Sequence, residues 1–109
     1  MPEKTYPFQH VINRNNNHTQ IICENRYYRA ECTYQDGILD IYFTNQDPMP
    51  PLVFTPANTQ HKAHVGFVCE SYQIAQLTKY REQSVLFEAI DFQNGLIDLL
   101  RKEINPEII

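Results

Sequence analysis

The sequence has little of what several protein classes need, and each shortage excludes one of them. Glycine occurs only at positions 37, 66 and 95, so no glycine-rich loop is present to hold a nucleotide phosphate. The cysteines form no C-x-x-C pair. No apolar run approaches the roughly 20 residues that cross a bilayer, so no membrane span is predicted.

Positive charge is also scarce. Nine Lys and Arg stand against thirteen Asp and Glu, which gives a formal net charge of −4. A general nucleic-acid binder needs clustered positive charge facing phosphates, so nucleic acid is not the expected partner. An acidic chain instead suits a basic protein partner, because complementary charge speeds association.

The cysteines indicate the cellular setting. Their number is odd (Cys23, Cys32 and Cys69), and the first ten residues lack the apolar stretch of a signal peptide. We therefore expect a cytoplasmic protein whose thiols are all reduced.

What the sequence does contain is typical of one α+β domain covering residues 1–109. Short β-like runs alternate with turn signals up to about residue 70, and helical patterns follow. The pattern predicts an antiparallel sheet built from the first ~70 residues, with one or two C-terminal helices packed on one face.

The clearest element is a hairpin of residues 26–34 and 38–44. Asp36-Gly37 between them is typical of a type I′ turn, whose two central residues both need positive φ. The resulting register pairs Cys32 with Ile41 on an apolar face and Glu31 with Tyr42 on a polar face.

Weaker strands are predicted at 8–13, 19–25, 52–54 and 64–70, with a proline-rich break at 46–51. Gly66 is expected to mark a bulge or a close backbone approach.

The C-terminal third is predicted to be helical, with its boundaries set by local signals. A helix is expected over 71–83 and another over about 94–104, which Asn94 or Asp91 would cap. Between them, 84–91 fits helix or strand, with helix favoured. The apolar stripe predicted for this region is Leu86, Ile90, Ile97, Leu100 and Ile104.

His61 and His64 are the residues that most resemble a reactive pair, with Cys69 nearby as a third metal ligand. A zinc site needs more ligands at suitable spacing, and 61 and 64 would point to opposite faces of a strand, so we expect a polar loop entering a strand and no metal site. A hydrolase using His61 or His64 as general base stays open. So does a nuclease that combines Asp40 with Gln60-x-Lys62.

The polar face of the hairpin is the predicted partner-binding surface. Tyr27, Arg29, Glu31 and Tyr42 project from it together with Thr33 and Asp40. Tyr and Arg are frequent at binding hot spots. The sequence thus favours a non-enzymatic protein-interaction domain without a cofactor: an inhibitor, an immunity or antitoxin-type protein, or an accessory subunit. A hydrolase or nuclease, or a small-molecule binder with an aromatic pocket between sheet and helices, is the alternative.

Overall fold

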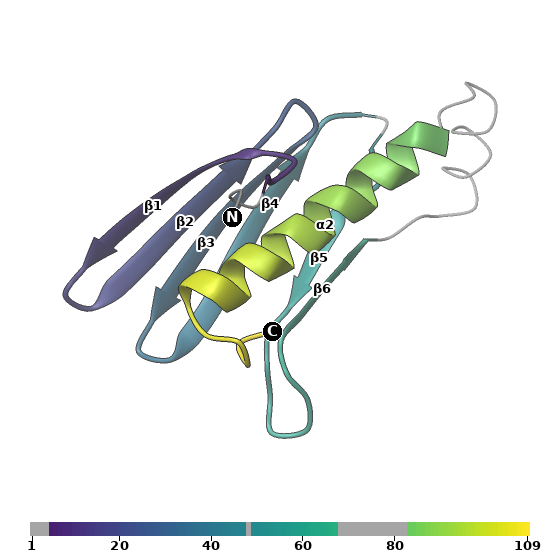
Figure 1. Ribbon diagram of the computed structural model, residues 1–109. Helices are drawn as coiled ribbons and strands as arrows, with labels where there is room; N and C mark the ends of the chain where they lie inside the picture. Colours follow the sequence, from purple (N-terminus) through teal and green to yellow (C-terminus); the bar gives the residue numbers. More distant parts are fainter. Residues whose placement is uncertain (1–4, 48, 68–82) are drawn as a thin grey trace.

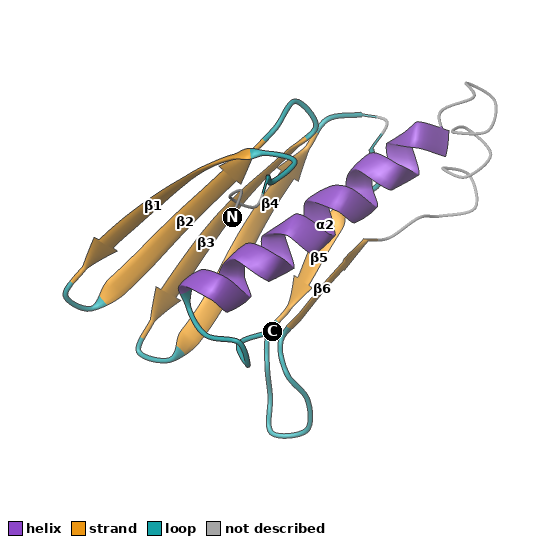
Figure 2. Ribbon diagram, viewed as in Figure 1, coloured by secondary structure: helices purple, strands orange, loops and turns teal. Residues whose placement is uncertain are grey.

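The computed structural model describes residues 5–47, 49–67 and 83–109. It shows the predicted α+β architecture, in which helix α2 (Gln83–Glu103) lies across one face of a four-stranded antiparallel sheet (Figures 1 and 2). The strands of this sheet are in chain order: β1 (Gln9–Asn15), β2 (His18–Glu24), β3 (Tyr28–Gln35) and β4 (Ile38–Asn45). A second, two-stranded sheet of β5 (Leu52–Thr55) and β6 (His64–Phe67) follows beside β4.

The β3–β4 hairpin confirms the predicted turn and register. Asp36 and Gly37 have φ of 53° and 79°, the left-handed values that a type I′ turn requires. Cys32 pairs with Ile41 and Glu31 with Tyr42. Along β3 and β4 buried and more exposed residues alternate, so one face of the hairpin packs into the core.

The weaker strand predictions are also confirmed, the last of them over its described residues 64–67, whereas the expectation for Gly66 is wrong. β1 pairs with β2 in a hairpin closed by Asn15 and His18, and β5 pairs with β6. Gly66 is neither a bulge nor a close approach, because it pairs in regular register with Val53 and a Cβ atom there would meet nothing within 4 Å. Among the described residues β6 pairs with β5 alone.

Aromatic rings join the sheet to the helix. The ring of Phe92 on α2 lies 5.2 Å from that of Tyr28 on β3 and 5.1 Å from that of Phe8, which precedes β1. The buried Tyr28 hydroxyl donates a hydrogen bond of 2.6 Å to the carbonyl of Pro50. The proline-rich break is thereby fixed to the core, because a buried hydroxyl needs a partner.

Helix α2 corrects the predicted boundary at Asn94-Gly95. The helix is continuous from Gln83 to Glu103, so residues 84–91 are helical, and neither Asn94 nor Asp91 caps a helix. Gly95 is buried under the segment before β1, where a Cβ atom would lie 2.8 Å from Cδ of Pro7 and 3.0 Å from Cε2 of Phe8. The glycine therefore serves close packing rather than helix termination.

The apolar stripe of α2 also differs from the prediction. Of the predicted residues, Leu100 is fully buried, whereas Ile90 is 38% exposed and the remainder are partly buried. The buried side chains recur every three or four residues, as packing against a sheet requires: Val85, Ala89, Phe92, Leu96, Leu99 and Leu100.

Helix α2 ends at Glu103, close to the predicted end at about residue 104, and Pro106 lies just beyond it. Two nitrogens of the Arg101 guanidinium donate to the main-chain oxygen of Ile109, which ties the last residues to α2. The helix predicted over 71–83 lies outside the described residues, apart from Gln83. No helix in the part of the chain that the structure describes is long and apolar enough to cross a membrane.

Candidate functional site

The face of the four-stranded sheet opposite α2 is the candidate binding surface, and we call it the outer face. Its residues are those that alternate with the buried ones, so they follow from the strand registers. No described element packs on it (Figure 1). Reading across β1 to β4, its rows are Gln9, Glu24, Arg29 and Thr44; Val11, Ile22, Glu31 and Tyr42; Asn13, Gln20, Thr33 and Asp40; and Asn15, His18, Gln35 and Ile38.

Three of the four predicted binding residues share this face. Tyr42 on β4 is 64% exposed and lies opposite Glu31, and Arg29 follows on the same side of β3. Tyr27 lies instead in the turn before β3, where it is partly buried and the Arg26 guanidinium stands 4.6 Å from its ring centroid. It therefore borders the outer face rather than projecting from its middle.

Arg29 organises the charges at one end of the face. Its guanidinium binds Glu24 and Glu31, each at 3.2 Å. The hydrogen bonds to Glu24 and then Glu31 raise the pKa of Arg29. Since Arg29 is in contact with water, these ion pairs orient the side chains but add little stability.

Three apolar members of the outer face were not predicted. Val11 is 56% exposed and Ile38 69% exposed, while Ile22 is partly buried between Val11 and Glu31. The signal was present in the sequence, because the register of a two-residue turn at Asn16-Asn17 puts Val11 opposite Ile22. The second row, Val11, Ile22, Glu31 and Tyr42, is thus an apolar strip with one carboxylate and one aromatic ring.

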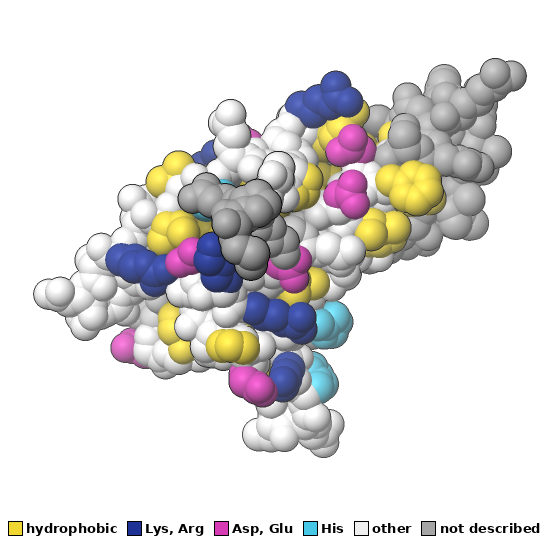
Figure 3. Space-filling model, viewed as in Figure 1, with side chains coloured by type: hydrophobic (Ala, Val, Ile, Leu, Met, Phe, Trp, Pro, Cys, Tyr) yellow, Lys and Arg dark blue, Asp and Glu magenta, His cyan; other side chains and the backbone are white. Residues whose placement is uncertain are grey.

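The outer face is acidic. Glu24, Glu31 and Asp40 stand against Arg29 alone, which leaves two net negative charges among its strand residues. On the opposite side of the molecule, acidic and basic side chains are interspersed over α2 and its surroundings (Figure 3).

His61 lies in the β5–β6 loop, as predicted, and uses both ring nitrogens within that loop. Asn58 Oδ1 accepts from the main-chain N–H groups of Gln60 and His61, which fixes its amide so that Nδ2 faces His61 Nε2 at 2.9 Å. His61 Nε2 must then accept, and Nδ1 donates to the carbonyl of Lys62 at 3.0 Å. His61 is bonded as a loop-forming residue rather than as a free base.

The rings of His61 and His64 lie close together, although the sequence pattern placed them on opposite faces of a strand. Their centroids are 6.2 Å apart because His61 is in the loop and His64 begins β6. The described residues contain no group of three His, Cys, Asp or Glu side chains placed to hold a metal ion. Cys69, the third ligand considered, lies outside the described residues, so the absence of a metal site stays a prediction.

The nuclease arrangement is not formed in the described structure. Gln60 and Lys62 lie in a loop and not on a strand, and Lys62 Nζ pairs with Glu107 at 3.1 Å. Asp40 is an exposed residue of β4 on the outer face. The lysine is thus held by the C-terminal segment instead of facing Asp40.

Cys23 and Cys32 are free thiols buried beneath α2. Burial raises the pKa of the Cys23 thiol to about 12 and raises that of Cys32 as well. Because the thiolate is the reactive form, both are structural residues rather than nucleophiles.

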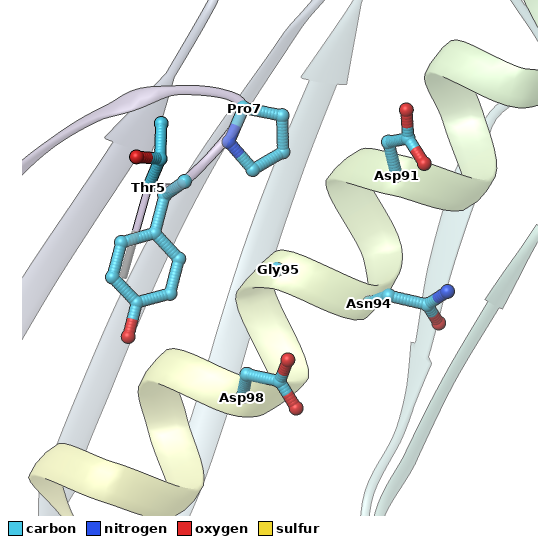
Figure 4. Close-up of a pocket in the computed structure, with 7 residues that line it drawn as sticks. Thr5, Pro7, Asp91, Asn94, Gly95 and Asp98 are labelled. Carbon is cyan, nitrogen blue, oxygen red and sulfur yellow. The ribbon is translucent and has the colours of Figure 1, made fainter. Parts of the chain in front are cut away.

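Two larger hollows lie near the segment before β1, and both open to solvent. One of about 360 Å³ lies between that segment and α2, lined by Thr5, Tyr6, Pro7, Asp91, Asn94, Gly95 and Asp98 (Figure 4). The other, about 600 Å³, is lined by Tyr6, Phe8, Gln9, Glu24, Asn25 and Arg26. Neither is the predicted aromatic pocket between the sheet and the helix.

Comparison with known proteins gives no further guide to function. No model of a known family, no curated protein and no solved structure matches the chain.

Proposed function

We propose that this chain is a protein-interaction domain that binds a basic protein partner through the outer face. It would act as an inhibitor, an immunity or antitoxin-type protein, or an accessory subunit. The observation that carries the proposal is Tyr42, which is 64% exposed at the end of an apolar strip on a face that no described element covers. An exposed aromatic ring beside apolar side chains is a common anchor of protein interfaces.

The chemistry around Tyr42 supports a partner with a basic rim and an apolar centre. Val11 and Ile22 supply the apolar part of the strip, and Glu31 lies between them and Tyr42. The surplus of carboxylates on the face would attract Lys and Arg side chains, and the chain's net charge of −4 adds long-range attraction.

A cytoplasmic setting belongs to the same proposal. Cys23 and Cys32 are free and buried in the middle of the sheet. Unpaired thiols are the usual state of cysteine in a reducing compartment.

The test is capture of a partner from native lysate by wild-type chain and two variants. Tyr42→Ala removes the ring on the outer face, and Phe87→Ala removes an equally exposed ring on α2. The proposal predicts that Tyr42→Ala loses most of the captured protein, whereas Phe87→Ala retains it. Capture should also weaken as salt concentration rises, because charge attraction is screened.

Two results would overturn the proposal. One is a captured protein retained equally by both variants. The other is loss with Phe87→Ala and not with Tyr42→Ala, which would move the binding surface to the helix side.

A further inference from the structure

We propose that two copies of this chain pair through the free edges of their β1 strands, antiparallel, with Ile12 opposite Ile12 of the second copy. The two four-stranded sheets would then join into one continuous sheet. The free edge of β1 adjoins the outer face, but the pairing does not depend on the proposed function.

The free edge of β1 has unused hydrogen-bonding groups. Among the described residues, β1 pairs with β2 alone, and no other main-chain hydrogen bond reaches it. Asn15 and His18 flank the two-residue turn, so the main-chain N–H and C=O groups of Asn15 point toward β2. Since inward and outward groups alternate along an antiparallel strand, the N–H and C=O groups of His10, Ile12 and Arg14 face outward.

The outward groups of β1 complement themselves. Ile12 is the middle residue of Gln9–Asn15, and His10 and Arg14 lie at equal distances on either side. When a second β1 runs antiparallel with Ile12 on the two-fold axis, Ile12 meets Ile12 and His10 meets Arg14. Every outward group then finds a partner, whereas any shifted register leaves some without one.

The side chains fit the same register. On the outer face Gln9 would lie opposite Asn15 of the second copy, two amides that can bond each other, and Val11 opposite Asn13. On the helix side the two Ile12 side chains, each partly buried, would touch across the axis.

Charge also favours a second copy at this edge. The chain is acidic overall, yet residues 4–23 contain no Asp or Glu, so two copies meet there without opposed carboxylates. The one charged side chain of β1 at neutral pH, Arg14, is already bound by Glu103 Oε2 at 2.6 Å.

The usual protection of an edge strand is missing from β1. Natural edge strands commonly carry lysine, proline or a bulge that prevents pairing. β1 has no Lys, Pro or Gly, its one charged side chain, Arg14, is paired with Glu103, and it pairs with β2 in unbroken register over its length. Because the same edge meets itself, the pairing closes at two copies and does not propagate.

Cysteine cross-linking tests the register directly. Ile12→Cys would place two thiols opposite each other, with Cα atoms about 5.5 Å apart, within the range that a disulfide bridges. His10→Cys is the matched control, because its two thiols would lie roughly 13 Å apart along the strands. The proposal predicts a disulfide-linked dimer on mild oxidation of Ile12→Cys and none beyond the wild-type background for His10→Cys. Equal linking of both variants would refute the register, and linking of neither would refute the pairing.

Sedimentation of the full chain gives an independent readout. The wild-type protein should approach the mass of two chains as its concentration rises. Ile12→Lys, which sets two like charges across the axis, should shift it to one chain, whereas Ile38→Lys, an exposed position on β4 away from the pairing edge, should not. A wild-type chain of single mass at every concentration would overturn the proposal. A dimer that Ile38→Lys dissociates while Ile12→Lys leaves it intact would do the same. A thermal melt of Ile12→Lys shows whether the variant is folded. If it is not, the cross-linking of Ile12→Cys and His10→Cys is the deciding test.

Discussion

Gly95, in the middle of α2, lies directly against Pro7. A Cβ atom on Gly95 would stand 2.8 Å from Cδ of Pro7, closer than real Cβ contacts allow, and 3.0 Å from Cε2 of Phe8, which is also tight. The contact joins the segment before β1 to the helix, and it explains a glycine inside an otherwise unbroken helical segment.

We predict that Gly95→Ala destabilises the protein even though alanine is the better helix former. The gain in helix propensity is about 1 kcal/mol, and displacing the Pro7–Phe8 segment should cost more, about 1–3 kcal/mol. Denaturant unfolding measures the difference. Asn94→Ala, exposed one residue earlier, is the control and should be neutral or slightly stabilising. If Gly95→Ala stabilised the protein as much as Asn94→Ala, the close packing against Pro7 would be wrong.

Two other glycines give a matched pair of substitutions. Gly37 has φ of 79°, so Gly37→Val should destabilise the fold by about 1–3 kcal/mol through backbone strain. Gly66 lies in β6 without a positive φ and with open space around its Cα, so Gly66→Val should be neutral or stabilising. Thermal melts of both variants check this, and a reversed order of stability would contradict the turn assignment.

The hairpin faces predict opposite effects for neighbouring residues. Ile41→Ala opens a cavity under α2 and should cost about 2–5 kcal/mol. Tyr42→Ala, on the outer face, should change the free energy of unfolding by less than about 1 kcal/mol. Equal losses in denaturant unfolding would mean that both faces are buried and would remove the support for a binding surface.

The buried thiols predict an alkaline loss of stability. Burial raises the pKa of Cys23 from 9.0 to about 12 and raises that of Cys32 too, so above pH 9.0 the unfolded chain loses protons that the folded chain keeps. Stability contributed by these thiols is complete below pH 9.0 and falls as pH rises, by about 1.4 kcal/mol per pH unit for each thiol. Above pH 9.0, the free energy of unfolding should fall less steeply with pH for Cys23→Ala than for wild type. An unchanged slope would contradict burial of the neutral thiol.

The sequence predicted what local rules decide and failed where distant residues decide. Asp36-Gly37 fixes one turn geometry, and that turn fixes the pairing of Cys32 with Ile41, so the β3–β4 register was correct. Asn94-Gly95 has the same local appearance as a break. Its true role depends on Pro7, far away in the sequence, and no local pattern carries that information.

The candidate site was predicted in the same partial way. Period-two alternation put Arg29, Glu31 and Tyr42 on one face, where the structure has them. Val11 and Ile22 were not predicted, although a two-residue turn at Asn16-Asn17 sets the register that pairs them. The contact between the His61 and His64 rings depends on the path of a loop, which spacing alone does not fix.

Carboxyl footprinting of the chain, free and bound to its captured partner, tests the outer face most directly. Asp40 on β4 and Asp91 on α2 are both exposed carboxylates, on opposite sides of the sheet. If the outer face is the binding surface, the partner should protect Asp40 from modification and leave Asp91 as reactive as in the free chain. Protection of Asp91 with Asp40 still fully modified would contradict the account.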